Sequence, residues 1–408
     1  MKSGIDVSRI DPEFLMMLAD PVAGVYEAIE HDLLVNLAKR FDGGKRIPKS
    51  LVPGSTAWRA FMLEQMGALT RENIRLIARY SGDVSELTQL AVRTGIETAI
   101  SAVEPELAKA VAKPEYIPQR SEMVQRVMEA YTGQAINKYN MVNTVLLNSS
   151  LRAYEQLVGD TVAYQTRLDQ AQRTLNEETG VVIMGTKSRQ TAVRDAVKRM
   201  AAEGLTGFTD AAGRNWSAQA YVEMDIRTTS ANAAREAVMQ RNADYGNSLI
   251  SVSSHPGARP KCYPYQGKVY STDGTSGTTT DLHGRVIAYT PLSGTSYGEP
   301  DGLFGINCHH MSSPFLPGLS LIRDKPEGRA ENERLYKASQ EQRYMERKIR
   351  QVKTQADALA AAGDPESLAA AKELRGKART MNAELQEWCE ANERDYSPER
   401  VRVIRARK

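Results

Sequence analysis

The sequence is poor in the side chains that form disulfides, bind metals or build aromatic cores. Its 408 residues include three cysteines and five histidines, and aromatic residues make up 6%. Three cysteines cannot form a disulfide framework, so we expect folding in a reducing cytosol. The low aromatic content favours long helices packed through Ala, Leu, Val and Met.

Targeting segments and catalytic motifs are also missing. The first twenty residues hold no apolar run of signal-peptide length, and no run reaches the roughly 18 apolar residues of a membrane helix. The sequence has no serine elbow, Walker A loop, H-E-x-x-H pair or glycine-rich dinucleotide motif. A net charge of +3 gives no large basic field. We therefore expect a soluble protein without membrane contact that is neither an enzyme nor a free DNA-binding protein.

Residues 1–185 show the periodicity of helices. Asp20-Pro21 resembles an N-cap followed by proline at the first helical position. A second helix is expected from Ser55 to about Tyr80, because the spacing of Asp83 and Glu86 resembles a capping box that starts another helix. The stretch 121–179 has few helix breakers and predicts one or two long helices.

Residues 186–320 predict a small α+β domain. A helix should end at Gly204, a hairpin tip should lie at 208–216, and a further helix should end at Gly246. Strands are expected at 248–253, 267–271 and 285–290, separated by segments rich in Gly, Ser, Thr and Pro.

Residues 321–399 predict an antiparallel helical hairpin. Apolar residues recur in heptad spacing on both sides of a break at "AAAGDPES", where Asp364 and Pro365 have N-cap and first-turn positions. The segment 400–408 is a basic tail, which we expect to be disordered and to bind phosphates or an acidic protein surface. Its basic residues are Arg400, Arg402, Arg405, Arg407 and Lys408.

Two of the three cysteines and four of the five histidines fall between residues 255 and 310. His255, Cys262, Cys308 and His310 would form a Cys2His2 set, so a structural zinc site is one hypothesis. A second hypothesis is that the cysteines are small buried hydrophobes and the histidines hydrogen-bond to loops. A third is a nucleophilic Cys/His dyad, which the adjacency of Cys308 and His309 does not by itself establish.

The loops around this cluster hold residues with a predicted structural role. In "HPGARP", Gly257 lies between prolines and is expected to adopt positive φ, and Arg259 is placed to hydrogen-bond to loop carbonyls or a carboxylate. Structural roles are also predicted for Pro260, Gly267 and Asn307.

Four segments resemble the phage minor capsid protein 2 family and, more loosely, the Mu F-type head morphogenesis proteins. The sharpest are "SSHPGARPKCYPYQGKVYS" and "GLFGINCHHMSSPFLPG", and the weaker ones are "AVRDAVKRMAAEGLTGFTDAAGRNWS" and "YKASQEQRYMERKIRQVKTQADAL". The family usually has a histidine at the position of Cys262 and an arginine at that of His309. The ligand-like histidine of the family therefore corresponds to His310.

This resemblance implies a mainly α protein with a central Mu F-like α+β domain, acting as a minor structural component of the phage head. Such proteins are associated with the portal vertex during assembly, so portal, capsid and scaffold proteins are the expected partners, and residues 1–185 would make these contacts. Non-specific contact with packaged DNA, and an effect on DNA packaging or ejection, are further expectations. The protein would then be found in the virion after assembly in the host cytoplasm. The rival hypothesis is a Cys/His-dependent hydrolase or toxin-like transferase.

Overall fold

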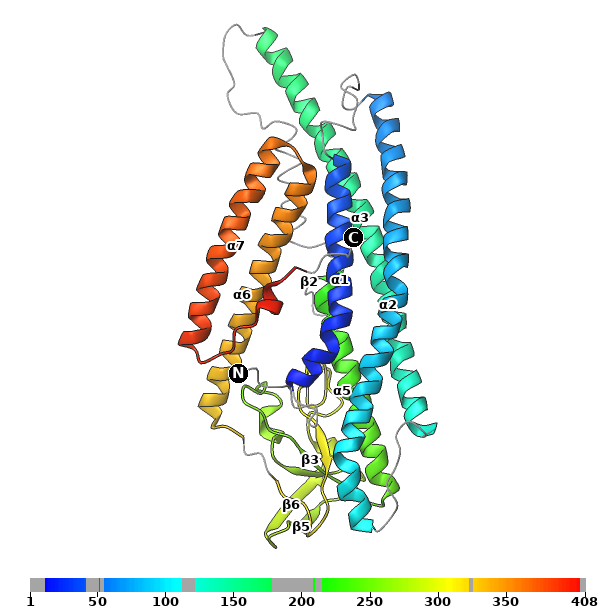
Figure 1. The fold of residues 1–408 in the computed structure, drawn as a ribbon, viewed down its shortest axis with the longest axis vertical. Helices are drawn as coiled ribbons and strands as arrows, with labels where there is room; N and C mark the ends of the chain where they lie inside the picture. Colours follow the sequence, from blue (N-terminus) through cyan, green and yellow to red (C-terminus); the bar gives the residue numbers. More distant parts are fainter. Residues whose placement is uncertain are drawn as a thin grey trace. The chain divides into compact units, whose positions relative to one another are not determined.

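The computed structural model describes residues 12–41, 51, 55–111, 122–177, 208–209, 215–322 and 326–403, and most of these are helical. Figure 1 shows the helices with the small sheet. The fold is mainly α with a small α+β part, as the sequence predicts. None of the described helices combines the length and apolar character needed to cross a bilayer. The described helices are α1 (Pro12–Phe41), α2 (Thr56–Val111), α3 (Glu122–Glu177), α5 (Ala218–Asp244), α6 (Arg329–Ala362) and α7 (Pro365–Ala391).

The chain folds into two compact units, and each unit is assembled from three separate stretches of sequence. Unit 1 contains residues 1–23, 83–139 and 221–341, and unit 2 contains 24–82, 140–220 and 342–408. The division into four segments expected from the sequence stays a prediction.

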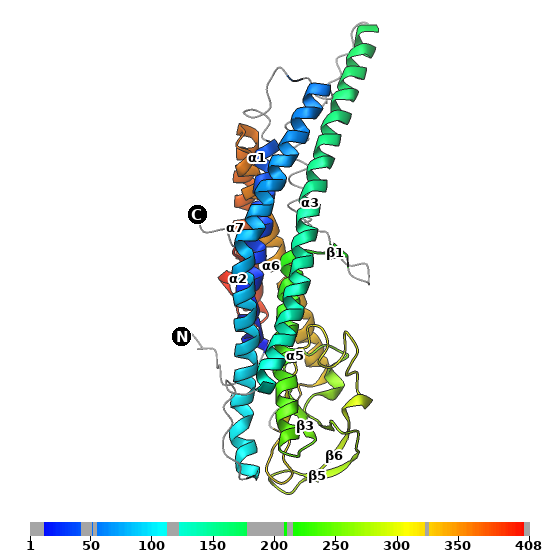
Figure 2. The ribbon, with the colours of Figure 1, turned by 90° about the vertical axis from the view of Figure 1, so that its right-hand side faces the viewer.

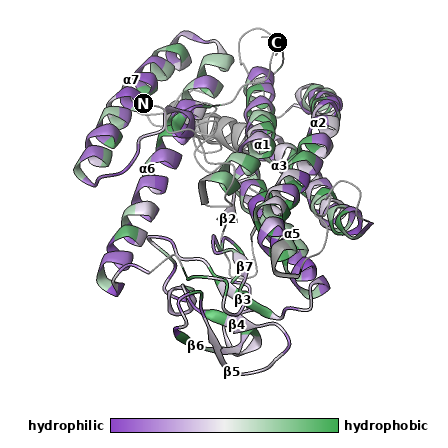
Figure 3. Ribbon diagram, turned by 60° about the horizontal axis from the view of Figure 1, so that its bottom comes forward, coloured by the Kyte–Doolittle hydropathy of each residue, from purple (hydrophilic) through white to green (hydrophobic). Residues whose placement is uncertain are grey.

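The sheet of unit 1 has five strands in the order β5-β6-β4-β3-β7. Its pairs are antiparallel except for β4 and β6, which run parallel. Figure 3 shows the hydrophobic residues of β3 and β4 near the middle of this sheet. The strands are β3 (Leu249–Val252), β4 (Val269–Ser271), β5 (Gly277–Thr280), β6 (Val286–Pro291) and β7 (Ser312–Pro314).

The two faces of the sheet bury different clusters because successive strand residues point to opposite sides. Leu249 and Val269 pack with Phe315 on one face. Ile250 and Tyr270 pack on the other face with both cysteines of the Cys/His window and with Met239 of α5. Figure 2 shows α5 running alongside the strands. The Cys/His loops therefore lie on the face of the sheet toward α5.

Two helix boundaries predicted from local sequence are wrong. Helix α1 begins at Pro12 and contains Pro21, so Asp20 is not its N-cap. Helix α2 continues from Thr56 to Val111 without a break at Asp83. The buried stripe of α2 passes through this point, with Ile77, Val84 and Ala91 on the inner face. Burial along the whole helix therefore outweighs the local capping signals.

Most other elements follow the sequence expectation. The stretch 121–179 contains the single helix α3, and Gly246 follows α5 with a φ of 75°. Strands β1 (Phe208–Thr209) and β2 (Asn215–Trp216) pair antiparallel, in agreement with the predicted hairpin. The expected helix before Gly204 lies outside the described residues. Strands β5 and β7 were not predicted, because they consist mainly of Gly, Thr and Ser and lack an apolar alternation.

Figure 1 shows α6 and α7 of the C-terminal helical hairpin side by side, and the hairpin belongs to unit 2 from residue 342 onward. Asp364 caps α7 by accepting a hydrogen bond from the Ser367 backbone N–H at 2.9 Å. Ile349 of α6 and Leu385 of α7 form the core of the hairpin with Cys389 and Val401. Figure 3 shows hydrophilic residues over much of both helices, with hydrophobic stretches between them.

The first part of the basic tail packs on this hairpin. Residues Pro398–Val401 form a short 3-10 helix, η4, and the Val401 side chain is buried. Lys353 and Arg350 of α6 donate to the carbonyls of Val401 and Arg400. The expectation of a disordered tail is therefore wrong for residues 400–403, because its backbone has partners on α6. Residues 404–408, with Arg405, Arg407 and Lys408, lie outside the described residues.

A buried histidine lies between two carboxylates in unit 2. Nδ1 of His31 is 3.2 Å from Asp32, and Nε2 is 3.5 Å from Asp357. Burial disfavours the charged ring, but the hydrogen bonds and charges of the two carboxylates outweigh it and raise the pKa of His31 to about 9. His31 is therefore protonated in the folded chain at neutral pH.

We predict that the protonated His31 stabilises the fold below about pH 6.5, the unfolded pKa of histidine. This stabilisation is lost as the pH rises towards the folded pKa of about 9. At about 1.4 kcal/mol per pH unit, the loss reaches about 3 kcal/mol. Urea unfolding at pH 6 and pH 9.5 should show this loss in the wild type but not in His31→Gln. An equal loss in both proteins would contradict the prediction.

Candidate functional site: the Cys/His cluster

The Cys/His cluster of unit 1 is built by loops that are fixed by the sheet and by α5. Cys262 lies in the turn before the short 3-10 helix η2 (Tyr263–Tyr265), and its backbone N–H donates to the Arg259 carbonyl at 2.9 Å. Cys308 lies at the end of a series of tight turns, and its backbone N–H donates to the Gly305 carbonyl at 3.0 Å. His310 immediately precedes the stretch that enters β7. Three side chains from two distant loops therefore converge at one point.

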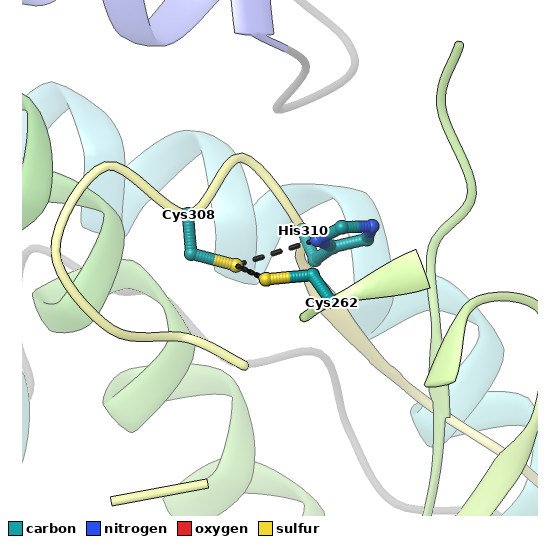
Figure 4. A group of neighbouring side chains, drawn as sticks. All are labelled: Cys262, Cys308 and His310. Atoms are coloured by element: carbon teal, nitrogen blue, oxygen red, sulfur yellow. Dashed lines mark hydrogen bonds between the residues drawn. The ribbon is translucent and has the colours of Figure 1, made fainter. Parts of the chain in front are cut away.

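Cys262, Cys308 and His310 point toward one another, as Figure 4 shows. The two Sγ atoms are 4.0 Å apart, and Sγ of Cys308 is 3.3 Å from Nδ1 of His310. The two sulfurs and one imidazole nitrogen all lie within 4.8 Å of one another. All three residues are buried, with exposures of 6% or less.

The two thiols have different acidities. The hydrogen bond from Cys262 lowers the pKa of the Cys308 thiol, and although burial opposes this, the hydrogen bond and charge of His310 also lower it. The Cys308 contact and burial raise the pKa of Cys262. The cluster thus favours a thiolate at Cys308, and a thiolate is the form of cysteine that binds metals and attacks electrophiles.

His255, the fourth predicted ligand, lies beside the cluster but outside the three-residue group. Its ring centroid is 4.4 Å from that of His310 and 5.9 Å from that of His309. Burial and the nearby charge of His310 lower the pKa of His255 to about 4, so its ring is neutral at pH 7. His283 is exposed in the turn between β5 and β6 and takes no part in the cluster.

Two polar residues around the cluster were not predicted. Arg235 of α5 is 3% exposed and donates to the carbonyls of His310 at 2.9 Å and Phe304 at 3.2 Å. Gln266 is 2% exposed, and its Oε1 is 3.0 Å from Nε2 of His310. The sequence gives one signal for Arg235: it lies on the face of α5 that is otherwise apolar, between Ala231 and Val238.

The "HPGARP" loop attaches to the first turns of α6. The side-chain amide of Asn332 forms two hydrogen bonds with the Ala258 backbone, accepting from N–H at 2.8 Å and donating to C=O at 2.7 Å. Gly257 has a φ of 69°. A Cβ on Gly257 would lie 3.2 Å from the backbone nitrogen of Tyr336. The loop thus depends on Asn332, another residue that sequence inspection did not identify.

The other predicted loop residues lie in the same loop system. Arg259 donates to the carbonyls of Asp301 at 3.3 Å and Ile306 at 2.5 Å, which links the two cysteine loops. Asn307 has a φ of 58°, and its Oδ1 accepts from Arg227 at 2.6 Å. Gly267 also has positive φ, and Pro260 is exposed in the turn before Cys262.

The described basic residues of the tail have partners within the chain. Arg402 is 3.5 Å from Glu399, and Arg400 is 3.9 Å from Glu346 of α6. Both arginines therefore have an acidic partner within the chain.

We predict that Gly257→Ala destabilises the fold more than Gly284→Ala. Both glycines have positive φ, but Gly284 has open space where a Cβ would lie, whereas Gly257 meets the backbone of α6. Positive φ alone costs roughly 1–2 kcal/mol for alanine. Displacing helix backbone should add at least about 1 kcal/mol at Gly257. Urea unfolding of both variants measures the difference, and equal losses would show that the close approach to α6 has no energetic weight.

Comparisons with known proteins give a consistent result. The family model described as "Phage minor capsid protein 2" matches residues 10–389. A "Structural protein" of Lactococcus phage LL-H is 29% identical over 315 residues, which cover 75% of this chain and 78% of that protein. A "Structural protein" of Lactococcus phage mv4 is 37% identical over 65 residues, which cover 16% of this chain and 53% of that protein. No solved structure matches the chain at a significant level.

Proposed function

Because the chain belongs to the phage minor capsid protein 2 family, we propose that it is a minor structural component of the phage head, incorporated during assembly in the host cytoplasm. The observation that carries this proposal is the extent of the family match, residues 10–389, which includes both the helices and the Cys/His region. The relative in phage LL-H, which carries the name "Structural protein", aligns over most of both chains and supports the same function.

We propose the portal protein, together with capsid or scaffold proteins, as the contact partners. Long helices with charged outer faces suit such contacts, and α6 exposes Arg347 and Lys348 in unit 2. Residues beyond Val403 would contact the portal or packaged DNA through Arg405, Arg407 and Lys408. Contacts of this kind need no enzyme activity, and they depend on surfaces rather than on a substrate cleft.

One observation favours the rival function of a Cys/His-dependent hydrolase. Sγ of Cys308 lies 3.3 Å from Nδ1 of His310, which is close to the distance between a nucleophile and its base. Burial argues against catalysis, since both residues and the neighbouring Cys262 are shielded from solvent. A nucleophile must reach the substrate, whereas a structural cluster need not.

We predict that iodoacetamide modifies none of the three cysteines in the native chain at neutral pH within minutes, because Cys262, Cys308 and Cys389 are all buried. After denaturation in the presence of a chelator, all three should react, and mass spectrometry of the peptides identifies each site. Rapid modification of Cys308 alone in the native chain would contradict the structural role and support the hydrolase.

The virion function is tested by truncation of the chain after Val403. This removes Arg405, Arg407 and Lys408 but keeps Val401, which the hairpin core requires. We predict that full-length chain co-purifies with DNA-filled heads and can be crosslinked to the portal protein. The truncated chain should show either reduced incorporation into procapsids, if the tail binds protein, or normal incorporation with changed DNA retention, if it binds DNA.

The matched control is the double variant Arg334→Gln, Lys337→Gln. It removes two exposed positive charges from α6 that pair locally with Glu331 and Glu333. It should change neither incorporation nor DNA retention. Absence of the full-length chain from purified heads would contradict the virion function, and wild-type behaviour of the truncated chain would contradict a role for the tail.

A further inference from the structure

We propose that Cys262, Cys308 and His310 bind one zinc ion and that His255 supplies the fourth ligand. The proposal rests on the convergence of three ligand atoms within 4.8 Å in a buried site. Two sulfurs with imidazole nitrogen are the donor set that zinc prefers in proteins. The site is independent of the proposed role in the virion and can be tested on the purified chain.

Two of the three distances between ligand atoms are close to those of a tetrahedral zinc site, and the third pair, Cys262 with His310, lies within 4.8 Å. Zinc bonds of about 2.3 Å to sulfur and 2.0–2.1 Å to nitrogen place two sulfurs about 3.8 Å apart and a sulfur about 3.6 Å from a nitrogen. In the structure the Sγ atoms are 4.0 Å apart, and Sγ of Cys308 is 3.3 Å from Nδ1 of His310. Shifts of a few tenths of an ångström in these two distances reach the tetrahedral values.

The hydrogen bond with Gln266 determines the tautomer of His310, and therefore which ring nitrogen presents a lone pair to the sulfurs. The backbone N–H of His255 donates to Oε1 of Gln266 at 2.9 Å, so this atom is the amide oxygen and accepts hydrogen bonds. Nε2 of His310 is 3.0 Å from the same oxygen and must therefore carry the proton. In the neutral ring Nδ1 then has a free lone pair beside Cys308. Metal-binding histidines are commonly held by a carbonyl in this way.

The same logic applies to His255. Its Nδ1 is 3.1 Å from the Pro256 carbonyl, so Nδ1 carries the proton in the neutral ring and Nε2 has the lone pair. Nε2 is buried and has no hydrogen-bond partner among the described residues. An unpartnered buried acceptor is costly, and a metal ligand bond would satisfy it. Its ring lies 4.4 Å from that of His310, so His255 is next to the cluster, and Nε2 would have to turn toward the sulfurs to take the fourth position.

The surroundings of Cys308 stabilise a thiolate, the form that binds zinc. The Phe304 backbone N–H donates to Sγ of Cys308 at 3.1 Å. The guanidinium of Arg235 lies nearby and holds the Phe304 and His310 carbonyls on both sides of the cysteine. Phe304 has a φ of 60°, a backbone conformation that is unfavourable for a residue other than glycine. The strained turn thus directs an N–H at the sulfur, which is what a metal-bound thiolate requires.

Four protein ligands would close the coordination sphere, which is typical of structural zinc. The ion would join the loop that follows β3 to the loop that precedes β7. Because the loops are far apart in the sequence, metal binding would contribute to folding of the region.

The first test measures metal directly. Chain purified without chelators, then loaded with zinc and desalted, should retain about one equivalent of zinc by mass spectrometry of the metal. Replacement by Co²⁺ should give a thiolate charge-transfer band and the intense visible bands of tetrahedral cobalt. Cys308→Ser should lose at least about 90% of the bound metal. Cys389→Ser removes the other buried cysteine, which lies in unit 2, and should retain it. Less than about 0.1 equivalent of zinc in the loaded wild type, or equal loss in both variants, would overturn the proposal.

The second test concerns the fourth ligand. His255→Gln should weaken zinc binding at least about tenfold, as measured by competition with a chromophoric chelator, while the thiolate band remains. His283→Gln, at an exposed histidine of the same sheet region, should leave the affinity unchanged. Unchanged affinity in His255→Gln would overturn the role of His255. If Cys308→Ser does not fold, the wild-type cobalt spectrum still decides the proposal, because a spectrum without thiolate charge transfer excludes sulfur ligation.

Discussion

The Cys/His region depends on the hydrogen bonds that the buried guanidinium of Arg235 donates to it. Buried backbone carbonyls need hydrogen-bond partners, and the turn from Phe304 to His310 has no strand or helix to provide them. Arg235 provides donors for the carbonyls at both ends of this turn. Burial lowers the pKa of Arg235, and the negative charge available at Cys308 opposes this effect. The cation and the thiolate therefore stabilise each other, and helix, turn and cluster form one interdependent arrangement.

The sequence predicts those parts of the site that consist of rare residue types, whereas the burial of common residue types is determined by the fold. Cysteine and histidine are concentrated between residues 255 and 310, and Cys262, Cys308 and His310 of this window converge in the structure. Residue counting works here because these side chains are rare in this chain and have specific chemistry. Arg235 and Gln266 belong to common residue types. Only the three-dimensional position of α5 and of η2 reveals that they are buried against the turn.

The same distinction explains which elements were predicted well. The α6/α7 hairpin is determined locally, by heptad spacing and by the Asp364 cap, so its boundaries follow from the sequence. The start of α1 and the continuity of α2 are determined by burial against other segments, and local caps at Asp20 and Asp83 gave the wrong boundaries. The edge strands β5 and β7 are held by pairing with β6 and β3 rather than by their own propensity. A Gly-Thr-Thr-Thr strand therefore cannot be recognised without its partner.

The basic tail illustrates the limits of charge patterns. Considered alone, residues 400–408 have the composition of a solvated segment that binds phosphates. In the structure the Val401 side chain completes the hairpin core, and Lys353 and Arg350 of α6 donate to the backbone of residues 400 and 401. These two cations of α6 therefore hold the tail in place. Repulsion between neighbouring positive groups is reduced by Glu346, which is buried near Arg400. The positive charges of Arg400 and Arg402 therefore have partners within the chain, which the composition of the segment alone does not reveal.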